Sequence, residues 1–340
     1  MDPLILGTII KIVLVLAIVS ALAGFGTYLE RKVLAYMQRR IGPAHVGPLG
    51  LLQIVADGIK LLTKEDIIPQ NANRIIFMIA PAVTAATAFV AISAVPLFPT
   101  FSFTVPDWFP LINGISATVP STIADINIGI LFMLGVMGSG LYGPLLAGMA
   151  QANKWGILGS ARTAVQFLSY EVITGLSLLA PIMLVGSLSL LDFNNAQTGG
   201  VGSWILWQQP IAFILFLIAG FAETNRTPFD LLEHEAEIVS GYATEYSGMR
   251  WGMFFIGEYA NMITISIMAS LIFVGGYAPL GFIPGWIAII LKISFFFFLM
   301  LWVRASWPHV RPDQLMWFCW KVLMPIAVIN VMITGIVVMI

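Results

Sequence analysis

Two carboxylic acids lie inside long apolar stretches of the sequence. Glu171 is near the middle of one uncharged run, and Glu258 is about two helical turns into another. An ionised carboxylate in hydrocarbon costs about 2.5–3.5 kcal/mol on insertion scales for Asp, so each acid must stay protonated or face a partner or water. A carboxyl group near that balance can relay protons; the alternative is a neutral acid that only hydrogen-bonds across helices. Lys292, in a third apolar stretch, is a possible counter-charge, and Lys11 is assigned no role.

A second set of acids is crowded between two apolar segments. Six of the 17 acidic residues fall within 23 positions: Glu223, Asp230, Glu233, Glu235, Glu237 and Glu245. Like charges at this density raise one another's pKa values and make their protonation collective, which suits a sensor of charge on a bound ligand. A solvated acidic loop is the alternative. Because Phe229, Leu231 and Tyr242 interleave with the acids, we expect the loop to be partly buried.

Two basic, turn-rich stretches lie directly beside apolar segments. The first runs from Glu30 to Pro43, and the second runs from Arg304 to Leu315. Lysine and arginine at such positions control membrane orientation and contact lipid headgroups. The functional alternative is that they dock a cytoplasmic partner or position an anionic headgroup.

Histidine and cysteine are too scarce for the chain to hold a redox centre of its own. Cys319 is the single cysteine, and the three histidines, His45, His234 and His309, all lie outside the apolar spans. This excludes a disulfide framework, a Cys/His metal or iron–sulfur site, and haem ligation within the membrane. The sequence also lacks a Walker A motif and a dinucleotide-binding fingerprint. If redox chemistry involves this protein, another chain must carry the electrons.

These side chains must be positioned by membrane helices. The 340 residues are 59% hydrophobic and 10% charged, with a mean hydropathy of +0.93, which excludes a disordered chain, a coiled coil and a nucleic-acid binder. Crossing about 30 Å of hydrocarbon takes roughly 20 helical residues. The sequence therefore predicts an all-α integral membrane protein with about eight spans. Their approximate limits are Leu4–Tyr28, Ile75–Leu97, Val119–Leu145, Ile157–Leu190, Trp204–Ala222, Trp251–Tyr277, Pro284–Val303 and Leu315–Val338.

The basic residues predict the orientation of these spans. Of the 16 lysines and arginines, 14 fall in alternate loops on one side, which should be cytoplasmic. The opposite loops, 98–118, 191–203 and 278–283, contain none. We therefore expect both termini on the outer side, with the first span retained as an uncleaved helix because its leading segment carries Asp2 instead of a basic cluster.

A short amphipathic segment separates the first two spans. Between Leu49 and Leu62, apolar residues gather on one helical face, and the segment is too short to cross the membrane. It is predicted to lie in the headgroup plane with its apolar face down; a helix buried against the bundle is the alternative. The predicted organisation is thus one membrane domain, 1–340, with an interfacial helix at 49–62 and an acidic cytoplasmic loop at 223–250. The sequence contains no internal repeat of the kind that inverted-repeat carriers show.

Several of these stretches resemble one known family. ERKVLAYMQRRIGPAHVGPLGLLQ, ADGIKLLTKEDIIP, AETNRTPFDLLEHEAEIVSGYATEYSGM, GEY at 257–259 and RASWPHVRPDQLM, in this order, are similar to the H subunit of proton-pumping NADH:quinone oxidoreductase, respiratory complex I. The resemblance covers nearly the whole chain. One departure is Ile54, where the family pattern would have proline. Related subunits occur in membrane-bound hydrogenases and in coenzyme F420 dehydrogenase, which leaves the electron donor open.

The resemblance implies a fold of eight membrane helices with an in-plane amphipathic helix, and roles for particular residues. Quinone binding, by lining or supporting a chamber and its membrane entrance, is implied for Glu30, Arg31, Arg39, Asp57, Glu223, Arg226, Phe229, Asp230, Glu233 and Glu235. A proton path toward the pumping subunits is implied for Glu171, Glu223, Asp230, Glu237 and Glu258. No residue of this chain is expected to be catalytic in the sense of holding a redox centre, and no metal ligand is expected.

The resemblance also implies the setting of the protein. The substrate would be ubiquinone or menaquinone, and the iron–sulfur clusters and flavin would belong to partner subunits. Those partners would be the peripheral iron–sulfur and quinone-site subunits, small membrane subunits and antiporter-like subunits, in a bacterial inner membrane and without nucleic acid. A proton-coupled secondary transporter and a purely structural anchor for a peripheral enzyme are the competing classes of function.

Overall fold

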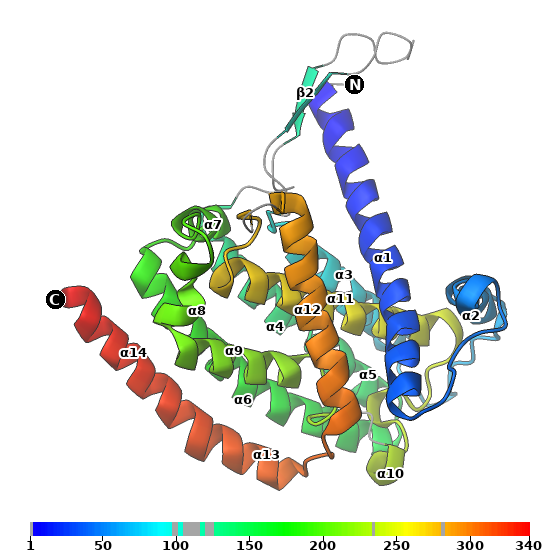
Figure 1. Ribbon diagram of the computed structural model, residues 1–340. Coiled ribbons are helices and arrows are strands. Elements are labelled where there is room, and N and C mark those ends of the chain that lie inside the picture. The colour runs from blue at the N-terminus through cyan, green and yellow to red at the C-terminus, as the bar shows by residue number, and fades with distance from the viewer. Residues whose placement is uncertain (1–2, 97–100, 105–115, 120–125, 233–234, 280–282) are drawn as a thin grey trace.

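The computed structural model describes residues 3–96, 101–104, 116–119, 126–232, 235–279 and 283–340. Most of these residues are helical, and the helices gather into one bundle (Figure 1). Six helical segments in the described part are long and apolar enough to cross a membrane. They are α3 (Arg74–Ile92), the consecutive α4 (Gly129–Ser139) and α5 (Tyr142–Ala150), α6 (Lys154–Val185), α11 (Gly248–Phe273), α12 (Gly285–Ser306), and the chain of helix from 312 to 339. The predicted class of all-α membrane protein is confirmed.

The other two predicted spans correspond to α1 and α9. Helix α1 (Pro3–Met37) continues well past the predicted end at Tyr28, and this extension carries Glu30 on the helix itself. Helix α9 (Pro210–Glu223) is shorter than the six spans and follows the single turn α8 (Ile205–Gln208). The predicted fourth span ends earlier than expected, because α6 ends at Val185 and its C-cap, Gly186, has a φ of 71°, the left-handed conformation that favours glycine. A separate helix, α7 (Leu190–Ala196), begins where the span was expected to end.

Helix α11 occupies the centre of the bundle. In α11, 83% of the most apolar stretch of 18 residues is buried inside the protein, whereas the corresponding share in the other five spans is 22–44%. It packs against α3, α12 and α1, whereas α6 packs against α9, α5 and the final helix. A side chain on α11 can therefore meet groups from several helices without reaching lipid, which is the position of Glu258.

The final helix contains a wide turn. It comprises α13 (Pro312–Phe318), a π-helical segment (Cys319–Leu323) and α14 (Met324–Met339), and it runs along the edge of the molecule in Figure 1. At the π segment, Cys319 Sγ donates to the Ser169 carbonyl at 3.3 Å and Trp320 Nε1 donates to Ser169 Oγ at 3.1 Å. Farther along, a buried set of amides and a hydroxyl fastens α14 to the start of α9: Gln209 Nε2 donates to Thr334 Oγ1 at 2.9 Å, and Asn330 Nδ2 donates to Gln209 Oε1 at 3.2 Å.

The segment between the first two spans forms a 3₁₀ turn, Pro48–Gly50, and helix α2 (Gln53–Thr63). Helix α2 lies at the side of the bundle in Figure 1, and none of its residues is buried. Leu62 is 70% exposed and Ile59 is 57% exposed. The helix is therefore not buried in the bundle, and its apolar side chains are available to a membrane surface.

Two short strands were not predicted. Strands β1 (Phe101–Thr104) and β2 (Ser116–Val119) form an antiparallel pair within the predicted outer loop. The third span consequently begins later than expected, because Val119 ends β2 and α4 starts at Gly129. The remaining short elements are the 3₁₀ turns Val201–Ser203 and Gly241–Ala243 (η3) and helix α10 (Glu235–Ile238).

Candidate functional site

Glu30 is the meeting point of three helices and a loop. The residue lies on α1 and is 6% exposed. Its Oε2 accepts a hydrogen bond from the Tyr259 hydroxyl on α11, and its Oε1 is ion-paired with Nη1 of Arg304 on α12. Nη1 of Arg226, on the loop after α9, lies 3.4 Å from Oε2. A buried carboxylate must be paired or become neutral, and here two guanidinium groups supply the pairing.

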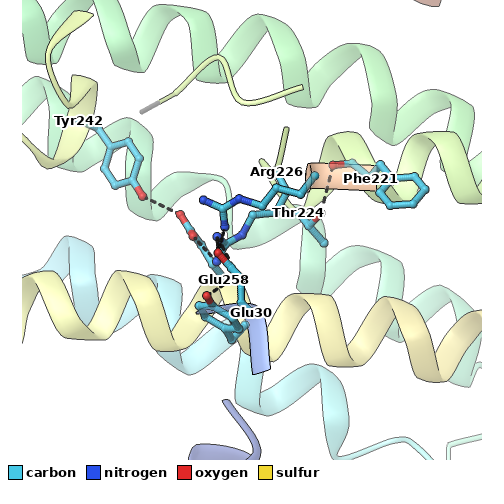
Figure 2. Close-up of polar contacts among 8 residues, drawn as sticks. Glu30, Phe221, Thr224, Arg226, Tyr242 and Glu258 are labelled. Carbon is cyan, nitrogen blue, oxygen red and sulfur yellow. Dashed lines mark hydrogen bonds and ion pairs between the residues drawn. The ribbon is translucent and has the colours of Figure 1, made fainter. Parts of the chain in front are cut away.

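Arg226 connects Glu30 to the intramembrane acid Glu258. Its Nη2 atom lies 3.3 Å from Glu258 Oε2, and the residue is 5% exposed. The guanidinium carbon also lies 4.5 Å from the centre of the Tyr259 ring, which places the cation over an aromatic face. Figure 2 shows Arg226 between the two carboxylates. The planar guanidinium of an arginine can donate to two carboxylates at once, and a lysine ammonium is less suited to this geometry.

Tyr242 extends the cluster toward the end of the bundle. Its hydroxyl donates to Glu258 Oε1 at 3.2 Å from the 3₁₀ turn η3 (Figure 2). The resulting chain of contacts runs from Tyr242 through Glu258, Arg226 and Glu30 to Arg304, and it holds two carboxylates and two guanidinium groups. The formal charges of these four groups balance. Because the groups interact directly, a proton or charge added nearby would change the electrostatic energy of all of them. We call these five residues together with Tyr259 the Glu30–Glu258 cluster.

The loop that carries Arg226 is held by its own backbone contacts and by α6. Thr224 Oγ1 donates to the Phe221 carbonyl at 3.0 Å, which extends the end of α9 (Figure 2). Gln166 Nε2 on α6 donates to the Ala222 carbonyl at 2.8 Å and to the Phe229 carbonyl at 2.9 Å. One buried amide of α6 thus holds both ends of the turn.

The loop is partly buried, as expected. Phe229 is 8% exposed and packs against the Tyr170 ring, with the ring centres 5.7 Å apart. Leu231 and Leu232 are 2% and 0% exposed, and Asp230 is half-buried. These hydrophobic residues anchor the loop against the bundle.

The far end of the loop is anchored by Tyr246. Its ring stacks on Phe77 with centres 4.0 Å apart, and its hydroxyl donates to the Phe77 carbonyl at 3.2 Å. Burial raises the pKa of the Tyr246 hydroxyl, so it remains a neutral donor. Both ends of the acidic segment are therefore tied to membrane helices.

Of the loop acids from 233 to 237, only the side chain of Glu237 is among those that the structure describes. Glu237 forms an ion pair with Arg162 on α6, with Nη1 2.6 Å from Oε2, and both side chains are partly exposed. Glu235 begins α10. Glu233 lies outside the described residues. Glu237 thus adds an ion pair to the contacts that Gln166 and Tyr170 make between the loop and α6.

Arg31, Asp57 and Arg39 are not in the cluster. Arg31 Nη1 lies 2.6 Å from Asp57 Oδ2, and this pair joins α1 to α2 at the surface, with side chains 49% and 30% exposed. Gln53 Nε2 donates to the other Asp57 oxygen at 2.9 Å. Arg39 is exposed at the end of α1 and has a φ of 56°. The predicted chamber residues therefore separate into a buried group and an exposed group beside α2.

Glu171 is not part of the Glu30–Glu258 cluster. It is exposed on α6, and its carboxylate fits against Gly138 of α4, where an added methyl group would overlap Oε1. Its charge acts on Glu223 at the end of α9. The acids predicted as one path therefore form two groups: Glu171 with Glu223, and Glu258 with Glu30, joined structurally by the loop after α9.

The prediction that Lys292 could neutralise an intramembrane acid is wrong. Lys292 is 6% exposed, and its Nζ donates to the Gly276 carbonyl at 2.9 Å and lies 5.2 Å from the Trp204 ring. This contact follows the end of α11 at Phe273, about 22 Å along the helix axis from Glu258. Lys292 therefore hydrogen-bonds the turn that follows α11 instead of pairing with an acid.

Sequence reasoning did not assign Arg304, Tyr242 and Tyr259 to the site. The sequence indicates Arg304 only as part of a basic junction, yet it lies in the last turn of α12 and pairs with Glu30. Tyr259 follows Glu258 directly in the GEY segment. One feature of the sequence could have indicated the role of Arg304. An arginine within the end of an apolar helix needs a buried partner.

The fold and site together define a helical membrane protein with a buried acid–base cluster. Within the described ranges, no group of three or more His, Cys, Asp or Glu side chains is arranged to hold a metal ion.

The sequence matches the model of the NADH dehydrogenase family over residues 10–335. It is 70% identical to the H subunit of the NADH-quinone oxidoreductase of a Nitratiruptor species over 98% of both chains. It is 66% identical to that of Wolinella succinogenes over 99% of both chains, and 56% identical to that of Helicobacter pylori over 100% of both. The chain belongs to this family and is a membrane subunit of complex I, the NADH-quinone oxidoreductase.

Proposed function

We propose that this chain forms the membrane side of a quinone-binding chamber and couples quinone reduction to proton pumping. The observation that carries the proposal is the buried pairing of Arg226 with both Glu30 and Glu258. A cluster of four formal charges in a buried site is costly unless every charge is paired. Such a cluster responds strongly to a change in charge beside it.

Quinone reduction supplies that change. A quinone that takes two electrons from an iron–sulfur partner also takes two protons to become the quinol, so the reaction withdraws protons from groups around the headgroup. A carboxyl group that gives up or regains a proton changes the attraction between Arg226 and its two acids. The loop after α9 then shifts its contacts with α6, through Gln166 and Phe229.

The response would pass from the cluster to Glu223 and Glu171. Glu223 ends α9, one turn before Arg226 along the chain, and it is electrostatically linked to Glu171. Glu171 is exposed on α6, where a neighbouring membrane subunit could receive the change in charge. Asp230 and Glu237 belong to the same loop and extend the acidic group toward the cytoplasmic surface. The pumping subunits would therefore be reached laterally.

The surface beside α1 and α2 is the proposed membrane entrance. Helix α2 exposes Val55, Ile59 and Leu62, an apolar set that can guide an isoprenoid tail. The ion pair between Arg31 and Asp57 holds α2 against α1, with Arg39 nearby on the chain. Ubiquinone and menaquinone share this tail chemistry, so either fits as the substrate.

The proposed setting is a bacterial inner membrane, with the basic loops and the Glu30–Glu258 cluster toward the cytoplasm and both termini outside. Partners there are the peripheral iron–sulfur and quinone-site subunits, which carry the electrons, and the small and antiporter-like membrane subunits. The relatives are named NADH-quinone oxidoreductase, which favours NADH over hydrogen or reduced F420 as the donor. Within this single domain, residues 223–250 serve as the acidic cytoplasmic loop and residues 49–62 as the interfacial helix.

The test is the Glu258→Gln variant in membranes that contain the whole complex. We expect quinone reductase activity coupled to pumping to fall at least tenfold, while NADH oxidation by a soluble acceptor stays normal. A variant that retains full coupled turnover would overturn the coupling role of the cluster.

A further inference from the structure

Helix α2 is attached to the bundle at two places. Its N-terminal half meets α1, where Asp57 pairs with Arg31 and a Cβ added at Gly24 would come within 2.9 Å of Ile54 Cγ2. Its C-terminal end meets the start of α11. Helices α1 and α11 also pack against each other. Helix α2, which lies beside α1 in Figure 1, therefore connects two helices that are already in contact.

The attachment to α11 brings backbone close to backbone. Gly248, the first residue of α11, has a φ of 58°, and a Cβ added there would lie 3.2 Å from the Lys64 carbonyl oxygen and 3.5 Å from that of Leu61. Ser247 Oγ donates to the Glu65 carbonyl at 3.0 Å. The partly positive start of α11 thus faces carbonyl groups at the end of α2, an arrangement that helix dipoles favour. The end of α2 is held through its backbone.

One ion pair reinforces this attachment. Nη2 of Arg250, in the first turn of α11, lies 3.1 Å from Asp66 Oδ2, and the two side chains are 20% and 39% exposed. The guanidinium carbon lies 5.5 Å from the centre of the Phe77 ring on α3, which itself stacks on Tyr246. Asp66 follows the end of α2 by three residues. The pair therefore ties the segment after α2 to a packed part of the bundle.

We propose that Arg250 and Asp66 are positioning residues for the quinone tail, which hold the C-terminal end of α2 where a long isoprenoid tail can pass along it. Ile59 and Leu62, the exposed apolar residues available to the tail, lie toward this end, whereas the contacts with α1 lie toward the other. Without the ion pair, α2 pivots about its contacts with α1 and these two side chains move. The inference rests on the proposed function, because it presumes that the tail enters beside α2.

The first test is the Asp66→Asn variant in proteoliposomes that contain the complete complex. Asparagine keeps the shape of the side chain, and a surface ion pair contributes little to folding stability, so assembly should be normal. The probes are two quinones with the same headgroup, one with a single isoprenoid unit and one with eight. We expect KM for the long-tailed quinone to rise at least threefold, with KM for the short-tailed quinone and both kcat values unchanged.

Glu65→Gln is the matched control. It removes the neighbouring exposed charge but keeps the backbone carbonyl to which Ser247 donates, so both KM values should remain those of wild type. An effect equal to that of Asp66→Asn would show that only general surface charge matters and would overturn the inference. Equal rises of both KM values in Asp66→Asn, or no rise in either, would overturn it as well.

The second test is a double-mutant cycle of Asp66→Asn with Arg250→Gln. If one ion pair carries the effect, the double variant should show the same ratio of the two KM values as either single variant. Additive effects would overturn the inference, as would a lower thermal midpoint of the complex with a normal ratio, because the pair would then be only a structural contact. Each of these outcomes leaves the proposed function intact, since that is tested by Glu258→Gln. A wild-type complex that reduces neither quinone would overturn both.

Discussion

Arg226 lies with Nη2 3.3 Å from Oε2 of Glu258, so a residue of the acidic loop neutralises a residue of the central helix. The same guanidinium reaches Glu30 on α1. The loop and two membrane helices therefore share one buried cation.

Loss of this shared cation should destabilise the protein strongly. Arg226→Met leaves Glu258 without this partner and weakens the pairing of Glu30, and removing one partner of a buried pair costs about 3–5 kcal/mol. The measurement is the amount of assembled complex on native gels after graded heating. In the double variant with Glu258→Gln, the loss should be smaller than the sum of the two single losses, because fewer unpaired charges remain. Additive losses would contradict the direct pairing.

Glu171→Gln should leave assembly intact and lower coupled turnover. The substitution keeps the size of the side chain and removes its ability to ionise. We expect NADH–quinone activity and proton uptake by vesicles to fall together by at least fivefold, with NADH–ferricyanide activity unchanged. Normal rates of both quinone reduction and pumping would exclude Glu171 from the proton path and leave it a packing residue.

A methyl group at Gly138 should have the same effect while leaving every carboxyl group chemically unchanged. In Gly138→Ala the new Cβ would overlap Glu171 Oε1 and displace the acid from α4. Gly175→Ala is the matched control. Gly175 lies on α6 one turn after Glu171, and nothing lies within 4 Å of its new Cβ. We expect Gly138→Ala to impair proton pumping and Gly175→Ala to pump normally. Equal pumping in the two variants would indicate that the position of the Glu171 carboxylate is unimportant.

Asp230→Asn should depress quinone reduction specifically. Asp230 follows Phe229, which is packed on Tyr170, so the amide should leave the loop folded while removing one of its charges. The expected result is a several-fold lower rate with a short-chain quinone and an unchanged rate with ferricyanide. If both rates decline in parallel, the loop docks the partner subunits instead of sensing the quinone.

Lys292→Met should reduce stability and spare the chemistry. The methionine fills a similar space but leaves the Gly276 carbonyl without its donor from Lys292, and the loss of a charged hydrogen bond costs about 1.5–3 kcal/mol. We expect a lower thermal midpoint for the purified complex and a normal quinone reductase rate per assembled complex. A specific loss of pumping at normal stability would show that Lys292 acts in proton translocation and not only in stability.

The sequence predicted the helical class and most spans because long apolar runs between charged or turn-forming residues have few structural solutions in a membrane. It also identified both intramembrane acids, since a charge inside such a run stands out. The hairpin of β1 and β2 was missed because its short strands carry little periodic signal. The end of α1 was misplaced because Glu30 looked like the start of a loop, whereas the helix continues and buries it.

Pairing between distant residues could not be predicted. Glu30 and Arg304 are 274 positions apart, and no local pattern says which of 14 basic residues on one side becomes buried. Lys292 shows the same difficulty. A lysine inside a span can donate to a backbone carbonyl near a helix end instead of pairing with an acid. Only the packing of α1, α11 and α12 decides between these partners.

The π segment in the final helix determines where that helix can lose a residue. A π turn holds one residue more than the α-helical turns around it, so the segment Cys319–Leu323 absorbs a surplus residue without rotating the helix after it. Removing one residue within it should leave Asn330 and Thr334 facing Gln209 and cost mainly the contacts to Ser169. Removing one residue just after it would turn the rest of α14 by about 100° and carry its polar groups into lipid. A single-residue deletion should therefore be tolerated within the π segment and should disrupt the protein when it falls in the first turn of α14.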